Sequence, residues 1–342
     1  MFTVPRRPYR HLRSVSLRLG ALALLVTLAA CAKPAKQACT GPNIAPSEGK
    51  LAVPDGNIWY KVSGTARATP VILLHGGPGY SSFYLKPFED LADDRPVVRY
   101  DQLGGGKSDR ISDTTLFTIA HFVRELDSLR AHLGCTRVHL LGHSWGTILA
   151  FEYYRAHPDH VASLILASAA IDIPTWERNA RRLVGTLSDS AQRAIRVREA
   201  QKHFDAPDYR AASSEFFGKY VMRTQVAAGT AGAADLDSTM STFNDAIYNY
   251  MQGPSEFTIT GTLRTYDATG QLGGVRVPTL YTVGEFDEAD TATIRRFAAL
   301  TPGAQVVVLA GAAHMTPWDA RDENVRVVRA FLRAADSTAA RR

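Results

Sequence analysis

The sequence has few cysteines and, beyond its N-terminal end, no long apolar run. A helix that crosses a bilayer needs about 20 consecutive apolar residues, and none of the segments after residue 30 in this chain of 342 residues approaches that length. Cys39 and Cys135 are the only cysteines after Cys31, and their separation does not match the spacing of a metal site. We therefore expect neither a metal nor another cofactor. A disulfide between the two is compatible with the sequence, although nothing else in the sequence supports it.

The sequence also lacks internal repeats and the charge excess of a nucleic-acid-binding protein. The formal net charge is +6, but five of these positive charges are arginines before residue 31, so the rest of the chain is close to neutral. The segment Gly104–Ser108 (GGGKS) resembles the end of a phosphate-binding P-loop. The full pattern requires a glycine five residues before Gly106, where this chain has Asp101, and no helical pattern begins at Lys107. We therefore expect a turn there, and neither nucleotide nor nucleic acid as a partner.

The N-terminal 30 residues have the layout of an export signal. They contain five arginines, no Asp or Glu, and an apolar run at Ala21–Ala30 that is too short to span a bilayer. The residues Leu28–Cys31 (LAAC) resemble the bacterial lipobox, whose cysteine is lipidated after cleavage. We therefore predict a signal peptide at 1–30 and an exported, membrane-anchored bacterial lipoprotein that faces the periplasm or the cell exterior. The alternative is a plain signal peptide in which Cys31 is incidental.

Short apolar runs bounded by turn residues indicate a buried parallel sheet. Residues 31–50 are rich in Ala, Lys, Pro and Gly and are interpreted as a tether. A first strand is expected at Ile58–Val62. The apolar runs predicted as further strands are Val71–His75, Val97–Asp101, Val138–Ser144, Leu164–Ser168, Leu280–Gly284 and Val306–Gly311.

Helical patterns alternate with these strands, as in a doubly wound α/β fold. Apolar residues recur at three- and four-residue spacing from Ile119 to Leu133, and further helices are expected after Ser144 and at Arg321–Leu332. Between about Asp172 and Gly274 we find no convincing strand. The helix-like stretches there are Trp176–Leu187, Ala191–Phe204, Tyr209–Thr224 and Ser238–Tyr250. The sequence thus predicts a core at 51–171 and 275–342, interrupted by a helical cap at 172–274.

A nucleophile motif lies at the end of one predicted strand. Gly142–Gly146 reads GHSWG and matches the pattern G-x-S-x-G. A serine at a sharp turn from strand to helix needs small neighbours, because the chain is strained and closely packed there, and the helix N-terminus favours developing negative charge. The motif alone is common, but its position between a strand and a helix predicts Ser144 as the nucleophile.

Such a serine requires a base, and the base requires an acid that orients it. Acid and base follow the serine in chain order in this type of fold. Asp287 lies just beyond Leu280–Gly284 and His314 just beyond Val306–Gly311, so both follow strands, at the edge where open α/β sheets place their sites. We therefore predict Ser144, Asp287 and His314 as a catalytic triad. The histidines interpreted as structural or solvated are His143, His157 and His160.

An oxyanion formed at Ser144 needs two donors, usually backbone N–H groups. The N–H of Trp145 is the first candidate. The loop His75–Gly79 (HGGPG) supplies the second, because glycine lets the backbone approach the substrate and proline stiffens the turn. We favour Gly77 as this donor, followed by Gly76.

Three of these segments together resemble the proline iminopeptidase family of α/β-hydrolases, especially its tricorn-interacting aminopeptidase branch, over residues 50–335. His75–Gly79 is similar to the family's H-G-G-P-G, Tyr100–Ser108 to Y-D-Q-x-G-x-G-x-S, and Gly142–Gly146 to G-x-S-W-G. The resemblance implies an α/β-hydrolase fold with a mostly parallel central sheet and a helical cap inserted between strands. It also implies a serine exopeptidase that releases an N-terminal residue, in this family proline, through an acyl-enzyme.

Two further segments bear on the substrate. Gly284–Glu288 is similar to the family's G-x-x-D-E and Gly253–Phe257 to its G-x-x-E-F. The resemblance implies that Glu256 and Glu288 hold the α-ammonium of a short peptide or aminoacyl amide; the alternative is two solvated surface acids. Two carboxylates in a partly dry pocket attract a cation strongly and repel each other without one. The aromatic residues expected in a ring-binding pocket, or alternatively in the core, are Tyr248, Tyr250 and Phe257.

Other functions remain open on the same residues. A carboxylesterase or an amino-acid amidase would use the same triad, and a catalytically silent surface binding protein would retain only the fold. An epoxide hydrolase or dehalogenase would need an aspartate at the position of Ser144.

Overall fold

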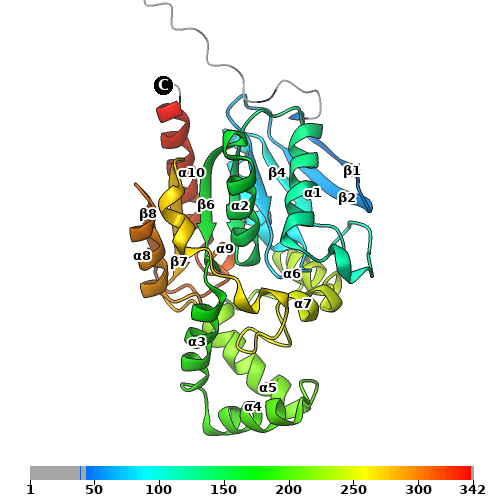
Figure 1. Ribbon diagram of the computed structural model, residues 1–342, viewed down its shortest axis with the longest axis vertical. Helices are drawn as coiled ribbons and strands as arrows, with labels where there is room; N and C mark the ends of the chain where they lie inside the picture. The colour runs from blue at the N-terminus through cyan, green and yellow to red at the C-terminus, as the bar shows by residue number, and fades with distance from the viewer. Residues whose placement is uncertain (1–38, 40–43, 340–342) are drawn as a thin grey trace, which may run out of the picture. The chain divides into compact units, whose positions relative to one another are not determined.

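An eight-stranded sheet organises the chain in the computed structural model, which describes Cys39 and residues 44–339 (Figure 1). The strand order is β1-β2-β4-β3-β5-β6-β7-β8; β1 and β2 form an antiparallel hairpin, β2 pairs antiparallel with β4, and all other pairs are parallel. The strands are β1 (Ser47–Val53), β2 (Gly56–Ser63), β3 (Val71–Leu74), β4 (Val97–Asp101), β5 (Val138–His143), β6 (Val161–Ala167), β7 (Thr279–Gly284) and β8 (Gln305–Leu309). The mostly parallel α/β fold that the sequence predicts is confirmed.

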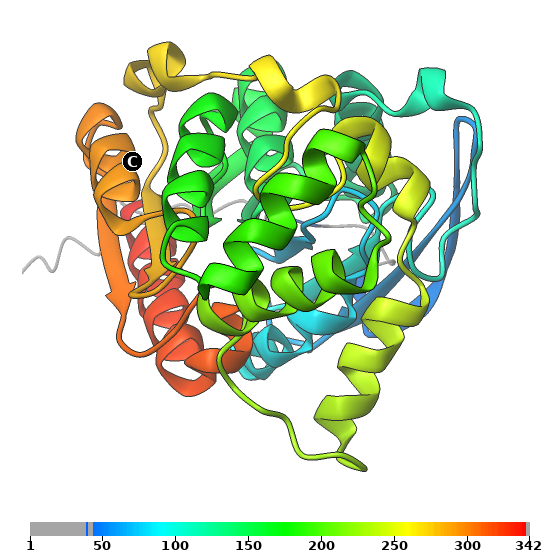
Figure 2. The same ribbon diagram turned by 90° about the horizontal axis from the view of Figure 1, so that it is seen from below.

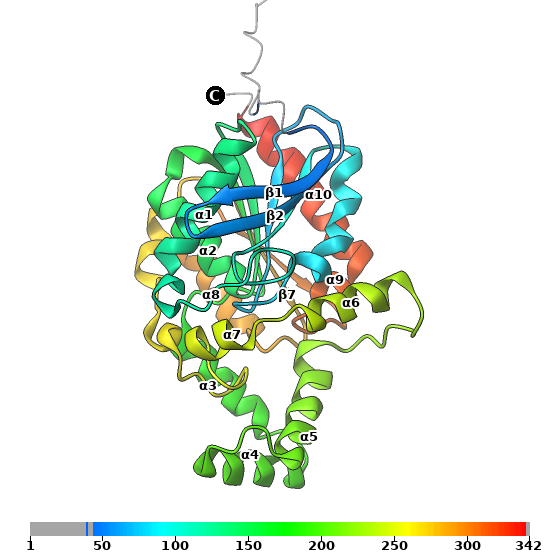
Figure 3. The same ribbon diagram turned by 90° about the vertical axis from the view of Figure 1, so that its right-hand side faces the viewer.

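Helices cover both faces of this sheet, which explains the continuous apolar runs. Every residue of β3, β4, β5 and β7 is buried. Figure 3 shows α1 and α2 on one side of the sheet, and α10 with the cyan segment η2 on the other. The segments that pack on the sheet are η2 (Ser82–Asp93), α1 (Ile119–His132), α2 (Trp145–Ala156), α8 (Thr291–Leu300) and α10 (Arg321–Ala339), and the short α9 (Thr316–Asp319) packs against η2 and α10. Parallel strands of this kind require cover on both faces.

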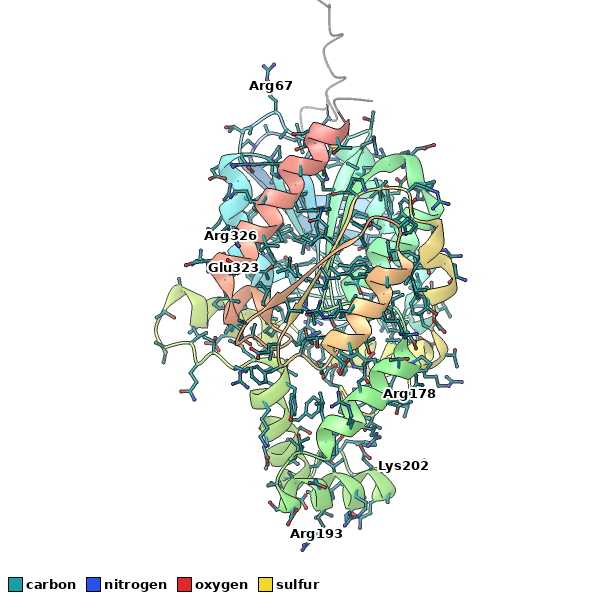
Figure 4. All side chains as sticks on the ribbon, turned by 90° about the vertical axis from the view of Figure 1, so that its left-hand side faces the viewer. Arg67, Arg178, Arg193, Lys202, Glu323 and Arg326 are labelled. Atoms are coloured by element: carbon teal, nitrogen blue, oxygen red, sulfur yellow. A yellow bond between two sulfur atoms is a disulfide. The ribbon has the colours of Figure 1, made fainter. Side chains whose placement is uncertain are left out.

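Between β6 and β7 the chain contains helices and turns but no strand. Figure 2 views the molecule from the side of this insertion, whose helices lie over the sheet. Its elements are α3 (Ile173–Val184), α4 (Asp189–Gln201), α5 (Pro207–Phe216), η5 (Phe217–Val221), α6 (Ala231–Ser241), α7 (Asp245–Met251), η6 (Thr262–Thr265) and η7 (Thr269–Gly274). Basic side chains such as Arg178, Arg193 and Lys202 point outward from it (Figure 4).

The helix predicted at Ser238–Tyr250 is in fact two helices, α6 and α7. Asn244 ends the gap between them: its side-chain oxygen caps the N-terminus of α7. The same residue attaches α7 to two loops of the core: its backbone N–H donates to the Gly79 carbonyl (2.8 Å), and its side-chain NH₂ donates to the Gly104 carbonyl (2.8 Å). These contacts come from loops far away in the sequence, so the local helical pattern gave no sign of the break.

The predicted tether at 31–50 extends too far, because β1 already begins at Ser47. This strand lies at the edge of the sheet and is exposed or half-buried along its length, so it has no apolar run. The turn predicted at Gly104–Ser108 is confirmed, and no helix begins at Lys107. The predicted signal peptide at 1–30, Cys31 and the first part of the tether lie outside the described residues.

A disulfide joins Cys39 to Cys135 across 96 residues of sequence. The sequence left this pairing open. Cys135 lies between the end of α1 and the beginning of β5, so the bond attaches the segment before β1 to the amino end of a central strand. Within the described residues, no helix combines the length and the apolar character that a bilayer crossing requires.

Gly146 should be intolerant of any side chain. A Cβ at this position would overlap the Leu74 carbonyl of the neighbouring strand, whereas a Cβ on Gly49 has no atom within 4 Å. We expect Gly146→Ala to lower the free energy of unfolding by about 1–3 kcal/mol or more through overpacking. Gly49→Ala, the matched control, should change it by less than about 0.5 kcal/mol. Urea denaturation followed by circular dichroism measures both, and equal stabilities of the two variants would contradict this packing argument.

Candidate active site

Ser144 lies at the sharp turn between β5 and α2. Its backbone adopts φ 56° and ψ −124°, a conformation that a residue with a side chain rarely adopts. The turn brings Gly142 against Gly146, and a Cβ on Gly142 would overlap the Gly146 backbone. The N–H of Ser144 donates to the Ala167 carbonyl of β6 (3.0 Å). The sheet and the helix therefore hold the serine at the carboxyl end of β5, as the sequence motif predicts.

Asp287 and His314 are brought together at the same edge of the sheet. Nδ1 of His314 lies 2.9 Å from Oδ1 of Asp287, and both residues are buried. An ionised carboxylate only accepts hydrogen bonds, so Nδ1 carries the proton and Nε2 is the basic nitrogen. Burial alone would raise the pKa of Asp287, but the His314 ring and hydrogen bonds from Ser168 and the Ala289 N–H outweigh it and lower that pKa. Asp287 is therefore suited to stabilise a protonated His314.

Ser168 is a contributor that the sequence did not reveal. It follows β6 with φ 51°, and its hydroxyl donates to Oδ2 of Asp287 (2.6 Å). The hydroxyl also lies 3.3 Å from the His314 carbonyl oxygen. Ser168 thus fixes the acid from the side opposite to the imidazole. Its position at the end of a predicted strand was the only available signal.

The two predicted oxyanion donors flank Ser144. A Cβ on Gly76 would lie 3.0 Å from the Ser144 Cβ, so the glycine loop packs against the nucleophile. The Gly76 N–H already donates to the Tyr84 hydroxyl (2.6 Å). Among the described residues, no acceptor is found for the N–H of Gly77 or Trp145. This arrangement favours Gly77 over Gly76 as the partner of Trp145.

The side chain of Gln102 links the glycine loop (His75–Gly79) to the N-terminus of α2. Its side-chain NH₂ donates to the His75 carbonyl (3.0 Å), and its side-chain oxygen accepts from the Trp145 indole (2.8 Å). Nε2 of His75 in turn accepts from the Gln102 backbone N–H (3.0 Å). The segment after β4 therefore links the glycine loop to the first residue of α2.

His143 and Tyr84 connect the glycine loop to the loop of the base. The Tyr84 hydroxyl lies 2.9 Å from Nδ1 of His143, and Nε2 of His143 lies 2.9 Å from the His314 carbonyl oxygen. A carbonyl only accepts, so His143 carries its proton on Nε2. Burial, with the nearby His314 ring, lowers the pKa of His143 to about 3. His143 is therefore neutral, in keeping with its predicted structural role.

Asp319, at the end of α9, anchors the loop of the base to the insertion. Its carboxylate accepts from the Ala313 N–H (2.9 Å), next to His314, and from the N–H groups of Arg223 (3.1 Å) and Thr224 (2.7 Å). One carboxylate therefore fixes both the residue before the base and the segment that follows η5. No sequence motif indicated this contact.

Glu256 and Glu288 lie close to the acid and the base. Oε1 of Glu288 is 4.0 Å from Nδ1 of His314, and Glu288 is fully buried. Neither of its carboxylate oxygens has a hydrogen-bond partner among the described residues. Glu256 accepts from the Tyr248 hydroxyl (2.7 Å). An unpartnered buried carboxylate is costly and calls for a cation or a proton.

The pKa values of Glu256 and Glu288 show that burial disfavours the charged form of both carboxyls. Burial raises the pKa of Glu256, and the His314 ring and the Tyr248 hydroxyl oppose that rise only in part. Burial, together with the charges of Glu256 and Asp287, raises the pKa of Glu288 well above its usual range. A bound ammonium group would reverse both effects, because opposite charge favours the ionised form of a carboxyl.

The aromatic residues predicted near Glu256 have different positions. Tyr248 and Phe257 line a cavity of about 290 Å³ together with Glu256. Tyr250 does not line it; the ring is 40% exposed and packs edge-on against Phe117 at 5.7 Å. The prediction that Tyr250 lines the cavity beside Glu256 is therefore wrong, because on α7 its ring turns instead toward Phe117, in the loop before α1.

Among the described residues, one group of possible metal ligands occurs, and it does not include any residue of the candidate active site. One ligand atom each from Asp127, His157 and His160 lie within 4.8 Å of one another. The same oxygen of Asp127 already accepts from the Arg130 guanidinium (2.9 Å) and the Tyr153 hydroxyl (2.8 Å). The arginine would repel a metal ion at that position, so the group is better explained as a hydrogen-bonded cluster.

A cavity of about 360 Å³ brings the predicted site residues together. Its walls include Gly77, Ser144, Glu256 and His314. The cavity thus places the predicted nucleophile, the predicted base, a candidate oxyanion donor and a carboxylate within one space. These are the components of acyl transfer by a serine nucleophile.

Comparison with known proteins agrees with this geometry. Residues 69–320 match the family model described as alpha/beta hydrolase fold. A proline iminopeptidase of Heyndrickxia coagulans is 40% identical over 289 residues, covering 84% of this chain and 98% of that protein. A solved proline iminopeptidase of Mycobacterium smegmatis aligns with a TM-score of 0.76 at 30% identity, over 86% and 100% of the two chains. The structure of VinJ aligns with a TM-score of 0.79 at 30% identity, over 85% and 99%. The chain therefore belongs to the proline iminopeptidase family of serine hydrolases with the alpha/beta-hydrolase fold.

Proposed function

We propose that this protein is a serine exopeptidase that releases the N-terminal residue, first of all proline, from short peptides and aminoacyl amides. The observation that carries the proposal is the pair Glu256 and Glu288 beside the residues of the predicted triad. The buried, unpartnered carboxylate of Glu288 favours a cation at this place. A free N-terminus supplies that cation, whereas an internal peptide bond does not. The names of the relatives support proline as the first residue.

In the proposed mechanism, Ser144 attacks the carbonyl carbon of the first residue while Nε2 of His314 takes the hydroxyl proton. Asp287 stabilises the imidazolium through Nδ1. The N–H groups of Gly77 and Trp145 bind the oxyanion. His314 then gives the proton to the leaving nitrogen, the C–N bond breaks, and a prolyl ester remains on the serine. Water attacks this ester with His314 again as the base, which releases the free amino acid.

Removing one carboxylate should separate a peptidase from an esterase. We expect Glu256→Gln to lower kcat/KM for proline p-nitroanilide about 10- to 100-fold, because a hydrogen bond to a charged group is worth about 1.5–3 kcal/mol. Hydrolysis of p-nitrophenyl acetate, which has no ammonium, should change less than about threefold. Ser144→Ala should lower both activities by several orders of magnitude.

The control for this comparison is Glu323→Gln, on the exposed surface of α10 (Figure 4). It should leave both activities as in the wild type. Equal losses of anilide and ester hydrolysis in Glu256→Gln would instead remove Glu256 from the recognition of the substrate ammonium. A Ser144→Ala variant that keeps wild-type rates would refute the nucleophile.

The charge on Glu288 should cost stability in the empty enzyme. Its pKa is raised in the folded state, so above the unfolded pKa of about 4.3 the unfolded carboxyl ionises more readily than the folded one, and the fold loses stability as the pH rises. Below that pH the carboxyl is protonated in both states and the cost disappears. We expect Glu288→Gln to raise Tm at pH 8 by about 2 °C or more, the effect of roughly 1 kcal/mol. The difference should vanish near pH 4, and calorimetry showing the same Tm difference at both pH values would contradict the assignment.

We also propose that the protein is exported and anchored through a lipid on Cys31. The layout of residues 1–30 supports export. The disulfide between Cys39 and Cys135 adds to this support, because such bonds persist in oxidising compartments outside the cytosol.

Substitution of Cys31 should release the protein from the membrane. In a bacterial host, the wild type should incorporate labelled palmitate and sediment with membranes, and Cys31→Ser should do neither. Cys39→Ser serves as the control, since it removes a cysteine while leaving the predicted lipidation site intact. Equal labelling of wild type and Cys31→Ser would rule out the anchor.

A further inference from the structure

The imidazole of His75 lies at the start of the glycine loop and takes no part in the proton transfers of the proposed mechanism. Its side chain is fully buried, and both ring nitrogens have a partner. Nε2 lies 3.0 Å from the backbone nitrogen of Gln102, and Nδ1 lies 2.9 Å from the carbonyl oxygen of Gly76. Two such partners on opposite sides of the ring hold it in one orientation.

The partners also determine which ring nitrogen carries the proton. The N–H of Gln102 can only donate, so Nε2 of His75 is the acceptor, and the Gly76 carbonyl can only accept, so Nδ1 carries the proton. Burial lowers the pKa of His75, although the charge of Asp101 and the hydrogen bond to Gly76 oppose that shift. A neutral ring fits this pattern, because neutral imidazole has one donor and one acceptor.

The Gly76 carbonyl belongs to the same peptide unit as the N–H of Gly77, the proposed oxyanion donor. This unit is trans, so its carbonyl and its N–H point in opposite directions. Holding the carbonyl against the His75 ring therefore turns the Gly77 N–H away from that ring. Gly77, Ser144 and Trp145 line a cavity of about 10 Å³, which is the space of a single oxygen atom or water molecule.

The peptide unit between Gly76 and Gly77 needs such a support more than its neighbours do. A glycine on each side leaves it free to rotate, and Gly77 has a φ of 113°. The preceding unit is held separately, because the His75 carbonyl accepts from the Gln102 side chain and the Gly76 N–H donates to the Tyr84 hydroxyl. Among the described residues, His75 is the only donor found for the Gly76 carbonyl.

The same hydrogen bond also affects the strength of the oxyanion donor. Hydrogen bonds that form a chain polarise one another, and the effect is larger in a buried place. A carbonyl that accepts from Nδ1 of His75 thus makes the N–H of its own peptide unit a better donor. Both the direction and the strength of the Gly77 N–H therefore depend on the ring.

We propose that His75 is a positioning residue of the reaction: its Nδ1–H holds the Gly76–Gly77 peptide unit so that the Gly77 N–H faces the oxyanion formed at Ser144. This inference rests on the serine acyl transfer of the proposed function, but not on which acyl group is transferred. His75 itself touches neither the substrate nor the reacting atoms.

Two substitutions divide the functions of the ring. The amide nitrogen of His75→Asn can take the place of Nδ1 and donate to Gly76, whereas the amide of His75→Gln reaches only the place of Nε2. We expect His75→Gln to lower kcat/KM at least about tenfold for proline p-nitroanilide and for p-nitrophenyl acetate alike, since one oxyanion donor is worth roughly 10²- to 10³-fold in kcat. His75→Asn should stay within about threefold of the wild type, because it retains the hydrogen bond to Gly76.

The matched control is His139→Gln. His139 is another buried imidazole with two partners, Ser163 and Asp336, but it lies near the amino end of β5. Its replacement should lower Tm without changing kcat/KM for either substrate. A loss of activity in His139→Gln equal to that in His75→Gln would overturn the inference, because the loss would then follow from any buried histidine.

Binding measurements separate the orientation of the donor from a general loss of structure. With proline boronic acid, Oγ of Ser144 adds to boron, its proton passes to His314, and the boron becomes a tetrahedral anion with a hydroxyl in the place of the oxyanion. Pyrrolidine carries the ammonium but has no carbonyl. His75→Gln should raise the inhibition constant of the boronic acid at least about tenfold and that of pyrrolidine by less than about twofold. Equal losses of affinity for both would indicate a merely structural role and overturn the inference.

The position of the proton on His75 can be measured without any substitution. NMR of the wild type with isotopically labelled histidine rings should show His75 neutral, with its proton on Nδ1, between about pH 6 and pH 8, whereas an exposed histidine titrates in this range. A proton on Nε2 of His75 would overturn the inference even where a variant fails to fold.

The outcomes also separate this inference from the proposed function. Equal kcat/KM values for His75→Asn, His75→Gln and the wild type would overturn the inference and leave the exopeptidase intact. A wild type that hydrolyses the ester but not the anilide would overturn the exopeptidase, and the ester rates of the two variants would still decide the role of His75.

Discussion

The hydrogen bond between Asp287 and His314 is the interaction on which the rest of this site depends. It keeps one carboxylate ionised in a buried place, with Ser168 holding its second oxygen. The adjacent carboxylate of Glu288 is equally buried but has no partner among the described residues. Two neighbouring acids thus differ because one is neutralised from within the protein and the other is not. We interpret this difference as a division between catalysis and recognition of a cation.

Hydrogen bonds between separate loops convert this local chemistry into a defined site. Gln102 joins the glycine loop to α2, and His143 joins it through Tyr84 to the loop of the base. Asp319 and Asn244 extend the same connections to the helical insertion. The insertion is therefore attached at the points where the reacting groups lie.

Much of this arrangement could be predicted from the sequence, because it is encoded locally. Continuous apolar runs identified the parallel strands, and a motif at a strand end together with chain order identified the three residues of the predicted triad. The edge strand β1 was not predicted, because its residues are exposed or half-buried and form no apolar run. Ser168 and Asp319 were not predicted for a different reason, because a single polar residue carries no sequence pattern. The partner of Ser168, Asp287, lies 119 residues away in sequence, and the partner of Asp319, Thr224, lies 95 residues away. The role of Tyr250 was wrong because neighbours in sequence were taken as neighbours in space.

The disulfide at Cys135 has a consequence for how substrates approach the enzyme. It clamps the chain at the amino end of β5, whereas Ser144 follows the carboxyl end of the same strand. With the proposed lipid on Cys31, the chain between Cys31 and the disulfide at Cys39 can extend to at most about 30 Å. In the proposed anchored form, the attachment to the membrane and Ser144 would therefore lie at opposite ends of the same strand, which would leave the catalytic edge of the sheet free for peptides in the surrounding water.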